Sequence, residues 1–180
     1  MNYKKDFPII MESVFGGHHK LSKPSETFLN LLCFEFIEKI IETCNHLLHP
    51  TDYESETIKS FPKKKLTNRE IETSIQLLFP KEITDYFIKN YKDVLYYKSK
   101  IFFSKSVTEH LIKKSIVNNI EITKKSIEFL TFLTETLIYD IFMFYNEIEK
   151  EKTITNKGLS KVFQEDKELK EILKVLKVSI

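Results

Sequence analysis

The sequence predicts an all-α fold built from two tandem helical repeats, and three observations lead to that prediction. Glycine and proline are scarce, at 3 and 5 of 180 residues, so the chain has little of the turn chemistry that a many-stranded fold needs. Apolar residues recur at helical spacing along two long stretches, and the order of elements in the first half returns in the second. With 42% hydrophobic residues, including 15 phenylalanines, the chain can fill a core and is not a disordered tail.

Two long helices are expected, over residues 24–49 and about 123–151. The apolar residues that keep helical spacing along the first are Phe28, Leu29, Leu32, Phe36, Ile37, Ile40, Ile41, Cys44, Leu47 and Leu48. This spacing is sustained for about seven turns. Ser22 and Pro24 are start signals, a capping side chain followed by a proline in the first turn, and Thr123 is the candidate cap of the second long helix.

The second half repeats the first at an offset of 101 residues through the long helix and 88 residues after it. The aligned pairs include Leu21 and Ile122, Ser22 and Thr123, Phe28 and Phe129, Leu66 and Ile154, and Asn68 and Asn156. The connector after the long helix is therefore longer in the first half, and its surplus, residues 50–61, is polar as expected of a surface insertion. Long helices that are apolar over much of their circumference would cross and bury each other.

Short helices are expected on both sides of each long helix. Those that open the two halves would cover residues 3–15 and 104–115. Thr67 and Glu70 have the spacing of a capping box, which starts the next short helix at residue 68. Pro80 ends that helix, and a further helix over about residues 81–99 is expected in the first half.

The overall charge is nearly balanced. Lysine and arginine together number 28 against 26 acidic residues, a net charge of +2, and Arg69 is the single arginine. Any surface for nucleic acid must therefore come from local clustering of lysines. Cys33 and Cys44 would lie on one face of the first long helix about 16 Å apart, too far to form a disulfide. We expect both to be core thiols in a reducing compartment.

No catalytic site, metal site or cofactor is predicted. The paired His18 and His19, and His46 with His49, have no cysteine or acidic ligand beside them at metal spacing. A glycine-rich phosphate loop, a nucleophile elbow and a credible carboxylate pair are all missing, so we do not expect an enzyme. Charges interrupt the apolar stretches before they reach membrane-spanning length, which predicts a soluble, intracellular protein with no membrane partner.

Four strings resemble the core histones. The string LTNREIETSIQLLFPKEI (66–83) closely resembles the signature of histone two-B, and LSKPSETFLNLLCFEFIEKIIETCNHLLH (21–49) fits the long helix of the same histone without a gap. In the second half, LSKVFQEDKELKEIL (159–173) is similar to the third helix and acidic turn of histone two-A, and FFSKSVTEHLIKK (102–114) to its first helix. The resemblance covers roughly residues 7–180. The chain thus resembles a fused histone doublet, two-B-like and then two-A-like, of the kind that some large DNA viruses encode.

This resemblance implies a fold and a function. The fold would be two tandem histone folds that form an intramolecular pseudo-heterodimer, in the handshake arrangement. Residues 1–100 would be the two-B-like fold with its extra C-terminal helix and the insertion at about 50–61, and residues 101–180 the two-A-like fold. The doublet would be the flanking dimer of a nucleosome-like particle, docked on a tetramer of the other two core histones, or on their complementary doublet, with double-stranded DNA around it. It would be found in the virion and in the host nucleus or viral factory.

The DNA-binding residues implied by the family lie in the loops between helices, where backbone amides, helix N-termini and basic side chains meet phosphates without reading bases. We expect the first loops of the two halves to lie together, with Lys20, Lys23, Thr123, Lys124 and Lys125. The second loops would likewise pair, with Lys63, Lys64, Lys65, Thr67, Lys150, Lys152, Thr153 and Lys157. Lys113 and Lys114, at the end of the helix over 104–115, complete the expected set.

The family also has an acidic patch that receives basic peptides of other chromatin proteins. The residues here that match it are Glu82, Glu135, Asp140, Asp166 and Glu168. Lys167 interrupts the cluster, and the alternative that these are scattered acids of helix surfaces stays open.

The chain departs from the family in its basic residues and at its end. The family inserts arginines into the minor groove, whereas these loops supply lysine or threonine, and lysine lacks the planar fork of arginine. The sequence ends at KVSI (177–180), where the family continues into a tail that docks on the tetramer. We therefore expect salt-sensitive wrapping with loosely held DNA ends.

A histone-fold regulatory or scaffold module of a transcription complex is the alternative function. The low net charge and the lack of arginines favour this alternative, and the two-B-like and two-A-like strings favour DNA packaging. Binding to random-sequence DNA would separate the two.

Overall fold

Eight helices and four two-residue strands make up the described part of the computed structural model, which comprises residues 2–17, 19–48, 64–97, 100–117 and 120–180. The first half contains α1 (Phe7–Phe15), β1 (Lys20–Leu21), α2 (Lys23–Leu48), β2 (Lys65–Leu66), α3 (Asn68–Leu78) and α4 (Lys81–Tyr97). The second half contains α5 (Lys105–Ser115), β3 (Glu121–Ile122), α6 (Lys124–Ile148), β4 (Thr153–Ile154), α7 (Asn156–Glu165) and α8 (Lys167–Leu176). The all-α class and the two consecutive repeats agree with the prediction from sequence.

The helix starts follow their capping signals. The Thr67 side chain accepts from the backbone of Arg69, and Glu70 accepts the Thr67 N–H at 2.8 Å in the predicted capping box. Thr123 accepts the N–H of Ser126 at 3.2 Å at the start of α6. Both starts confirm what the sequence predicted.

One helix boundary and one additional helix differ from the prediction. Helix α1 begins at Phe7 rather than residue 3, because the carbonyl of Tyr3 accepts the Asp6 N–H in a separate turn. The second half also has a helix that was not predicted, α8. Asp166 ends α7 and then caps α8 by accepting the Leu169 N–H at 2.7 Å, so the expected acidic turn is a helix junction.

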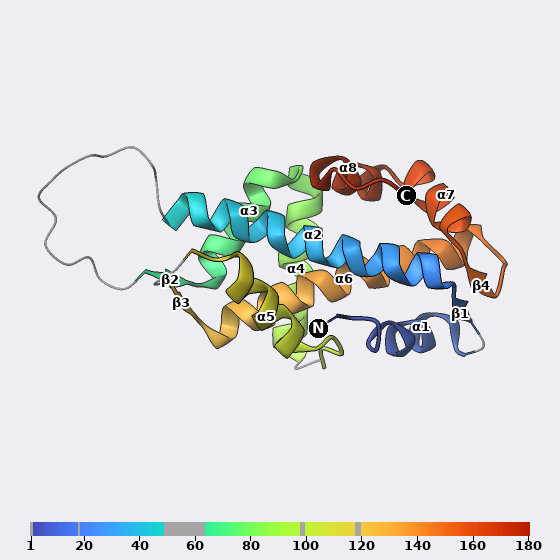
Figure 1. Cartoon of the computed structure of the whole chain (residues 1–180), viewed down its shortest axis with the longest axis horizontal. Coiled ribbons are helices and arrows are strands. Elements are labelled where there is room, and N and C mark those ends of the chain that lie inside the picture. Colours follow the sequence, from blue (N-terminus) through green and yellow to red (C-terminus); the bar gives the residue numbers. More distant parts are fainter. Residues whose placement is uncertain (1, 18, 49–63, 98–99, 118–119) are drawn as a thin grey trace, which may run out of the picture.

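The two long helices, α2 and α6, pack against each other and run in opposite directions (Figure 1). The start of α2 therefore lies beside the end of α6. Consequently β1 pairs in parallel with β4, with Lys20 opposite Thr153, and β2 pairs in parallel with β3, with Lys65 opposite Glu121. The sequence analysis predicted that the first loops of the two halves would lie together and that the second loops would do the same. That prediction was wrong, because the first loop of each half lies beside the second loop of the other.

One apolar core includes side chains from both halves. Its fully buried residues include Phe36, Ile40 and Leu29 from α2, and Phe129, Ile138 and Phe142 from α6. Cys33 and Cys44 are buried free thiols, as expected, and burial raises the pKa of Cys44 to about 11.

A buried hydroxyl network ties the start of the chain to the second half. The hydroxyl oxygens of Tyr3 and Thr108 are 2.6 Å apart, and Thr131 donates to the Thr108 hydroxyl at 2.8 Å. The Tyr3 N–H donates to Asn30 on α2 at 2.9 Å. Residues from α2, α5 and α6 are thus fixed around one tyrosine, because buried polar groups need hydrogen-bond partners.

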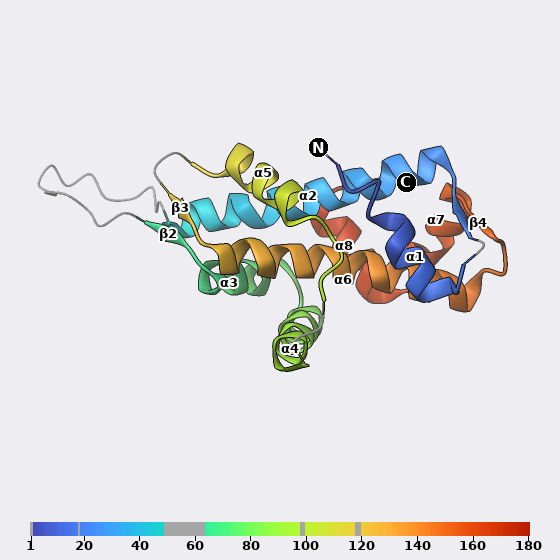
Figure 2. The ribbon, with the colours of Figure 1, turned by 90° about the horizontal axis from the view of Figure 1, so that it is seen from below.

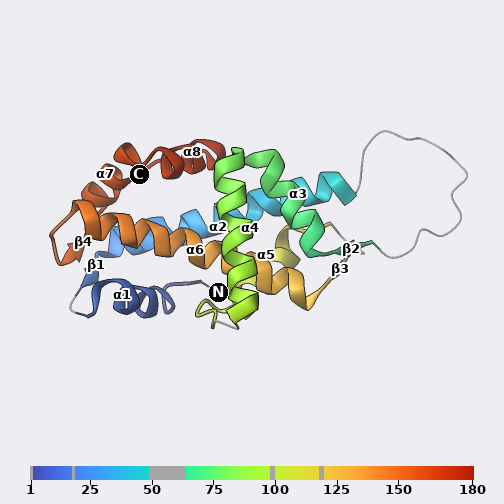
Figure 3. The same ribbon diagram turned by 180° about the vertical axis from the view of Figure 1, so that it is seen from behind.

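Helix α4 crosses α6 and stands away from the plane of the two long helices (Figures 2 and 3). The ring of Tyr91 lies 4.3 Å from that of Phe129 and 5.4 Å from that of Phe132. Burial of these aromatic faces holds α4 on α6 and creates a recess on each side of α6 next to α4.

No helix among the described residues is both long and apolar enough to cross a membrane. The division of the chain into residues 1–100 and 101–180 stays a prediction. The insertion at about 50–61 lies outside the described residues.

Candidate nucleic-acid interface

The first end of the molecule is formed by β1 and β4. The Lys20 N–H donates to the carbonyl of Lys152 at 2.8 Å, and the Ser22 N–H to the carbonyl of Ile154 at 3.0 Å. These bonds join the loop before α2 to the loop after α6, which are far apart in sequence.

Two helix N-termini are fixed side by side at this end. The Ser22 hydroxyl accepts the Ser25 N–H at 3.3 Å at the start of α2, and the Thr155 side chain accepts the Gly158 N–H at 3.3 Å at the start of α7. The Ser25 hydroxyl donates to Asn156 at 2.8 Å and so links the two starts. Unpaired N–H groups and the positive ends of two helix dipoles are therefore brought together.

Exposed lysines surround this pair of N-termini. The predicted residues that the structure brings to the first end are Lys20, Lys23, Lys150, Lys152, Thr153 and Lys157, all exposed. Lys4 and Glu26 form an ion pair of 3.4 Å nearby, and Glu151 is also exposed, so the end is basic but not uniformly so.

The second end is formed by β2 and β3 and has the same construction. The Glu121 N–H donates to the carbonyl of Lys64 at 2.9 Å, and the Thr123 N–H to that of Leu66 at 3.3 Å. The N-termini of α3 and α6 flank this strand pair, each with its threonine cap.

The predicted residues that lie at the second end are Lys64, Lys65, Thr67, Lys124 and Lys125, while Lys63 lies outside the described residues. Two of these lysines have partners within the chain. The Lys64 ammonium donates to the carbonyl of Leu48, at the last residue of α2. The Lys65 ammonium lies 3.2 Å from the Glu121 carboxylate. The second end therefore offers less free positive charge than its sequence indicates.

Helix α5 leads toward this second end. The Asn45 side chain donates to the carbonyl of Ser115 at 2.9 Å and accepts the Val117 N–H at 3.1 Å, which fixes the end of α5 to α2. Lys113 and Lys114 are exposed in the last turn of α5, and Lys113 pairs with Glu109 at 2.5 Å.

Phosphate binding at the two ends stays a prediction, and the groups that would carry it are alike at both. Strand backbones, capped helix starts and lysine side chains offer donors and positive charge, which suit the phosphates of any sequence. Two such ends on one rigid core would contact a duplex at two places.

The predicted acidic residues divide into separate groups. Asp140, Asp166 and Glu168 line one recess of about 240 Å³ between α4, α6 and the start of α8, together with Glu147. We call this recess the acidic groove. Its residues are Ile83, Tyr86, Phe87, Leu137, Asp140, Met143, Phe144, Glu147, Asp166, Glu168, Leu169 and Ile172. Glu82 is exposed in the first turn of α4 and does not line the groove.

Asp140 is a partly buried carboxylate of the acidic groove. Burial raises its pKa to about 7, and the nearby Asp166 and Glu168 carboxylates act in the same direction. The Tyr86 hydroxyl donates to Asp140 at 2.8 Å and opposes part of that shift. Burial also raises the pKa of Tyr86.

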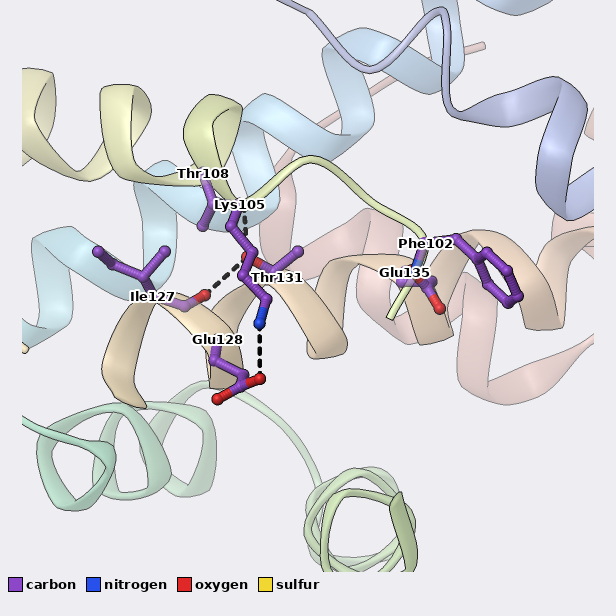
Figure 4. Close-up of polar contacts among 7 residues, drawn as sticks. All are labelled: Phe102, Lys105, Thr108, Ile127, Glu128, Thr131 and Glu135. Atoms are coloured by element: carbon purple, nitrogen blue, oxygen red, sulfur yellow. Dashed lines mark hydrogen bonds and ion pairs between the residues drawn. The ribbon is translucent and has the colours of Figure 1, made fainter. Parts of the chain in front are cut away.

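Glu135 has a structural role in addition to its charge. Its carboxylate accepts the backbone N–H groups of Phe102, which lies beside it in Figure 4, and of Phe103, both at 2.6 Å. The ion pair of Lys105 with Glu128, at 2.6 Å, fixes the start of α5 on α6 nearby. The structure places Glu135 beside the segment before α5, apart from the acidic groove.

Sequence reasoning missed three residues of these surfaces. Glu147 is two helical turns from Asp140, a spacing that could have indicated a shared face. Glu121 comes two residues before Thr123, the cap of α6. It faces Lys65 because β2 pairs with β3, and that pairing was not predicted. Tyr86 carried no signal in the sequence, because its partner Asp140 lies in the other half.

Among the residues that the structure describes, no three His, Cys, Asp or Glu side chains are grouped so that they could hold a metal ion. His18 and His49 lie outside the described residues.

Comparison with known proteins supports the fold. The chain is similar to the crystal structure of the histone from Methanopyrus kandleri, with a TM-score of 0.58 and 10% sequence identity. The match covers 91% of this chain and 93% of that one, so it includes both halves. The chain therefore has the all-helical architecture of a histone fold. No protein-family model matches the sequence, and no curated protein matches it.

Proposed function

We propose that this chain packages double-stranded DNA without sequence preference, through the two strand-paired ends of a histone fold. The single observation that carries the proposal is the repeated construction of those ends. Each combines a parallel strand pair, two capped helix N-termini and exposed lysines. Helix N-termini and lysine side chains bind phosphate without base contacts, and the strand pair holds these groups together at each end.

The more specific form of the proposal is a viral histone doublet, two-B-like and then two-A-like. It would act as the flanking dimer that docks on a tetramer of the other two core histones, in the virion and in the host nucleus or viral factory. The resemblance of the strings at 66–83 and 159–173 supports this form. Leu77 on α3, which is 65% exposed, offers an apolar side chain to such a partner.

Nuclease digestion tests the proposal. The chain is mixed with the complementary histone pair and random-sequence DNA, and micrococcal nuclease is added. We expect a discrete protected fragment that is lost as salt is raised, because the basic ends have lysine in place of arginine. A continuous smear of fragments, identical to that from free DNA, would contradict DNA packaging.

A regulatory or scaffold module is the second candidate, and one observation favours it. At the second end, the Lys65 ammonium is paired with the Glu121 carboxylate, which lowers the positive charge available to phosphate. Such a module would bind selected sequences or protein alone. Equal affinity for unrelated duplexes of the same length would rule it out.

A further inference from the structure

A groove of about 360 Å³ lies between α2 and the end of α8, apart from the acidic groove. We call it the α2–α8 groove. Its apolar residues are Leu31 on α2 and, at and after the end of α8, Val175, Leu176 and Val178. Leu31 is 45% exposed, although the adjacent Leu32 is fully buried. The groove therefore presents apolar surface to solvent.

Carboxylates form one wall of this groove. Glu35, Glu38 and Glu42 line it from α2, and their spacing of three and then four residues keeps them on one face of that helix. Glu42 lies 3.0 Å from the Lys39 ammonium. Among the residues that the structure describes, Glu35 and Glu38 take part in no ion pair. Two of the three carboxylates are thus available to cations from outside the chain.

Lysines form a second stripe, on α8. Lys170, Lys174 and Lys177 are all exposed, on the side of α8 opposite its buried residues. Their spacing is four and then three residues, the reverse of the order on α2. Lys174 lies 3.6 Å from Glu171, a contact between exposed side chains that is easily exchanged. At 1.5 Å per residue each stripe is roughly 10 Å long, so the two stripes have opposite charge, equal length and reversed spacing.

The helices α2 and α8 run in the same direction. The ring of Phe163, shortly before α8, lies 5.9 Å from that of Phe28, near the start of α2. Val178, after the end of α8, lines the groove beside residues further along α2. Figure 1 shows α8 lying beside the middle of α2, and the two helices are in contact. A twofold axis perpendicular to this surface reverses the direction of both helices, so the α8 of a second copy would run antiparallel to α2.

From this geometry we infer that two copies of the chain associate through the α2–α8 groove, in a dimer with twofold symmetry. In the antiparallel arrangement the carboxylates of one copy meet the lysines of the other, Glu35 with Lys177, Glu38 with Lys174 and Glu42 with Lys170. The same three pairs form again on the other side of the axis, because a twofold interface uses one patch twice. This association goes beyond DNA packaging, since the groove is at the middle of α2 and the strand pairs are near its two ends.

A second copy suits the groove better than a charged peptide does. The surface has carboxylates on one side and ammonium groups on the other. A peptide of one charge would therefore be attracted by one side and repelled by the other. The same surface, rotated by 180°, is complementary on both sides, and it brings the apolar residues of the two copies together at the centre.

Sedimentation equilibrium of the full chain without DNA measures this association. We expect a monomer–dimer equilibrium with a Kd on the order of 10 µM at low salt, because exposed charge pairs each contribute little. Raising the salt concentration should weaken the dimer several-fold by screening those pairs. A dimer of this strength is dissociated at nanomolar concentrations, so DNA affinity can be measured separately on the monomer.

Charge reversal on each stripe tests the pairing. Glu38→Lys with Glu42→Lys makes both stripes mainly basic, and Lys170→Glu with Lys174→Glu makes both mainly acidic. Each double variant alone should lose about tenfold or more in dimer affinity, because like charges then meet across the axis. An equimolar mixture of the two should form a heterodimer of about wild-type affinity, because opposite charges meet again on both sides.

A variant of α4 is the matched control. Lys89→Glu with Lys92→Glu gives the same change of net charge as the α8 variant, at exposed positions outside the groove. This control should dimerise as the wild type does. Its mixture with the basic α2 variant should not form a heterodimer of wild-type affinity. Thermal unfolding verifies that every variant is folded.

Three outcomes would overturn the inference. One is a wild-type chain that stays monomeric at concentrations well above the expected Kd. Another is unchanged dimerisation of the α2 and α8 variants, which would place the association on a different surface. The third is a mixture of the α2 variant with the α4 control that associates as strongly as the mixture with the α8 variant, since net charge alone would then cause the association.

Discussion

The Lys65 ammonium lies 3.2 Å from the Glu121 carboxylate, and the two residues are opposite each other on paired parallel strands. Both side chains are about half exposed, so the pair contributes little to stability. Its effect is on the surface potential of the second end, where Glu121 neutralises a lysine that the sequence assigns to phosphate.

Glu121→Gln should therefore increase DNA affinity. Releasing Lys65 for one phosphate contact should steepen the dependence of log Kobs on log salt concentration by roughly 0.9. Fluorescence anisotropy on a random-sequence duplex at several salt concentrations measures this slope. Glu171→Gln, which releases Lys174 on α8 away from both ends, is the matched control. Equal gains in both variants would mean that net charge alone sets the affinity.

Asp140→Asn should change how stability depends on pH. The pKa of Asp140 is about 7 in the folded chain, above its ordinary value of 3.8, because the carboxylate is buried. The ionised form is therefore disfavoured in the fold, and the wild type loses stability as pH rises from about 4 through 7. Asparagine does not ionise, so the variant should gain roughly 2–3 kcal/mol relative to wild type between pH 5 and pH 8.

Urea denaturation at both pH values measures this difference. Asp93→Asn, an exposed carboxylate on α4, serves as the control. If the difference in the free energy of unfolding between Asp140→Asn and wild type stays constant across that range, the pKa of Asp140 is not raised by burial.

Gly158→Ala should destabilise the first end. A Cβ atom at this position would lie 2.6 Å from the ring of Tyr145, which is fully buried and whose hydroxyl donates to the carbonyl of Thr153. Overpacking of this kind costs about 1–3 kcal/mol, more than the roughly 1 kcal/mol that alanine gains over glycine in a helix.

A double variant tests whether the Tyr145 ring causes this loss of stability. In a Tyr145→Leu background, Gly158→Ala should cost less, because the clashing ring is gone. Denaturant midpoints of the four proteins give the coupling energy. A stabilising Gly158→Ala in the wild-type background would show that α7 does not approach α6 as closely as described.

Tyr3→Phe should destabilise the chain by about 1 kcal/mol. The substitution removes the hydroxyl that shares a 2.6 Å hydrogen bond with Thr108 in a buried network. Tyr139→Phe, at a tyrosine on α6 that is 40% exposed, is the matched control. If both variants unfold at the same urea concentration as wild type, the network does not tie the start of the chain to α5.

Local signals in the sequence predicted most of the helices. Thr67, Glu70 and Thr123 are caps whose partners lie within one turn, so spacing alone predicted those helix starts. The start of α1 was missed because the Tyr3 carbonyl accepts the Asp6 N–H in a separate turn before the helix. The Asp6 side chain also accepts the N–H of Ser104, in the other half, which no local signal predicts.

The loop pairing could not be read from the same signals. Sequence repetition predicts that two halves are alike, but it does not give the direction in which their long helices run. The opposite direction of α2 and α6 brings Lys20 to Thr153 and Lys65 to Glu121. The predicted DNA-binding residues therefore regroup into different ends, and the neutralising role of Glu121 appears only in three dimensions.

The salt dependence of binding to random-sequence DNA tests DNA binding by the paired ends most directly. Two variants of the full chain that each exchange four exposed lysines for glutamine have the same net charge. The first changes the first end, at Lys20, Lys23, Lys152 and Lys157; the second changes α4 and α8, at Lys89, Lys92, Lys170 and Lys174. The first variant should lose roughly 2–4 from the magnitude of the slope of log Kobs against log salt concentration, and the second should keep the wild-type slope. Equal slopes for the two variants would contradict a DNA-binding role for the paired ends.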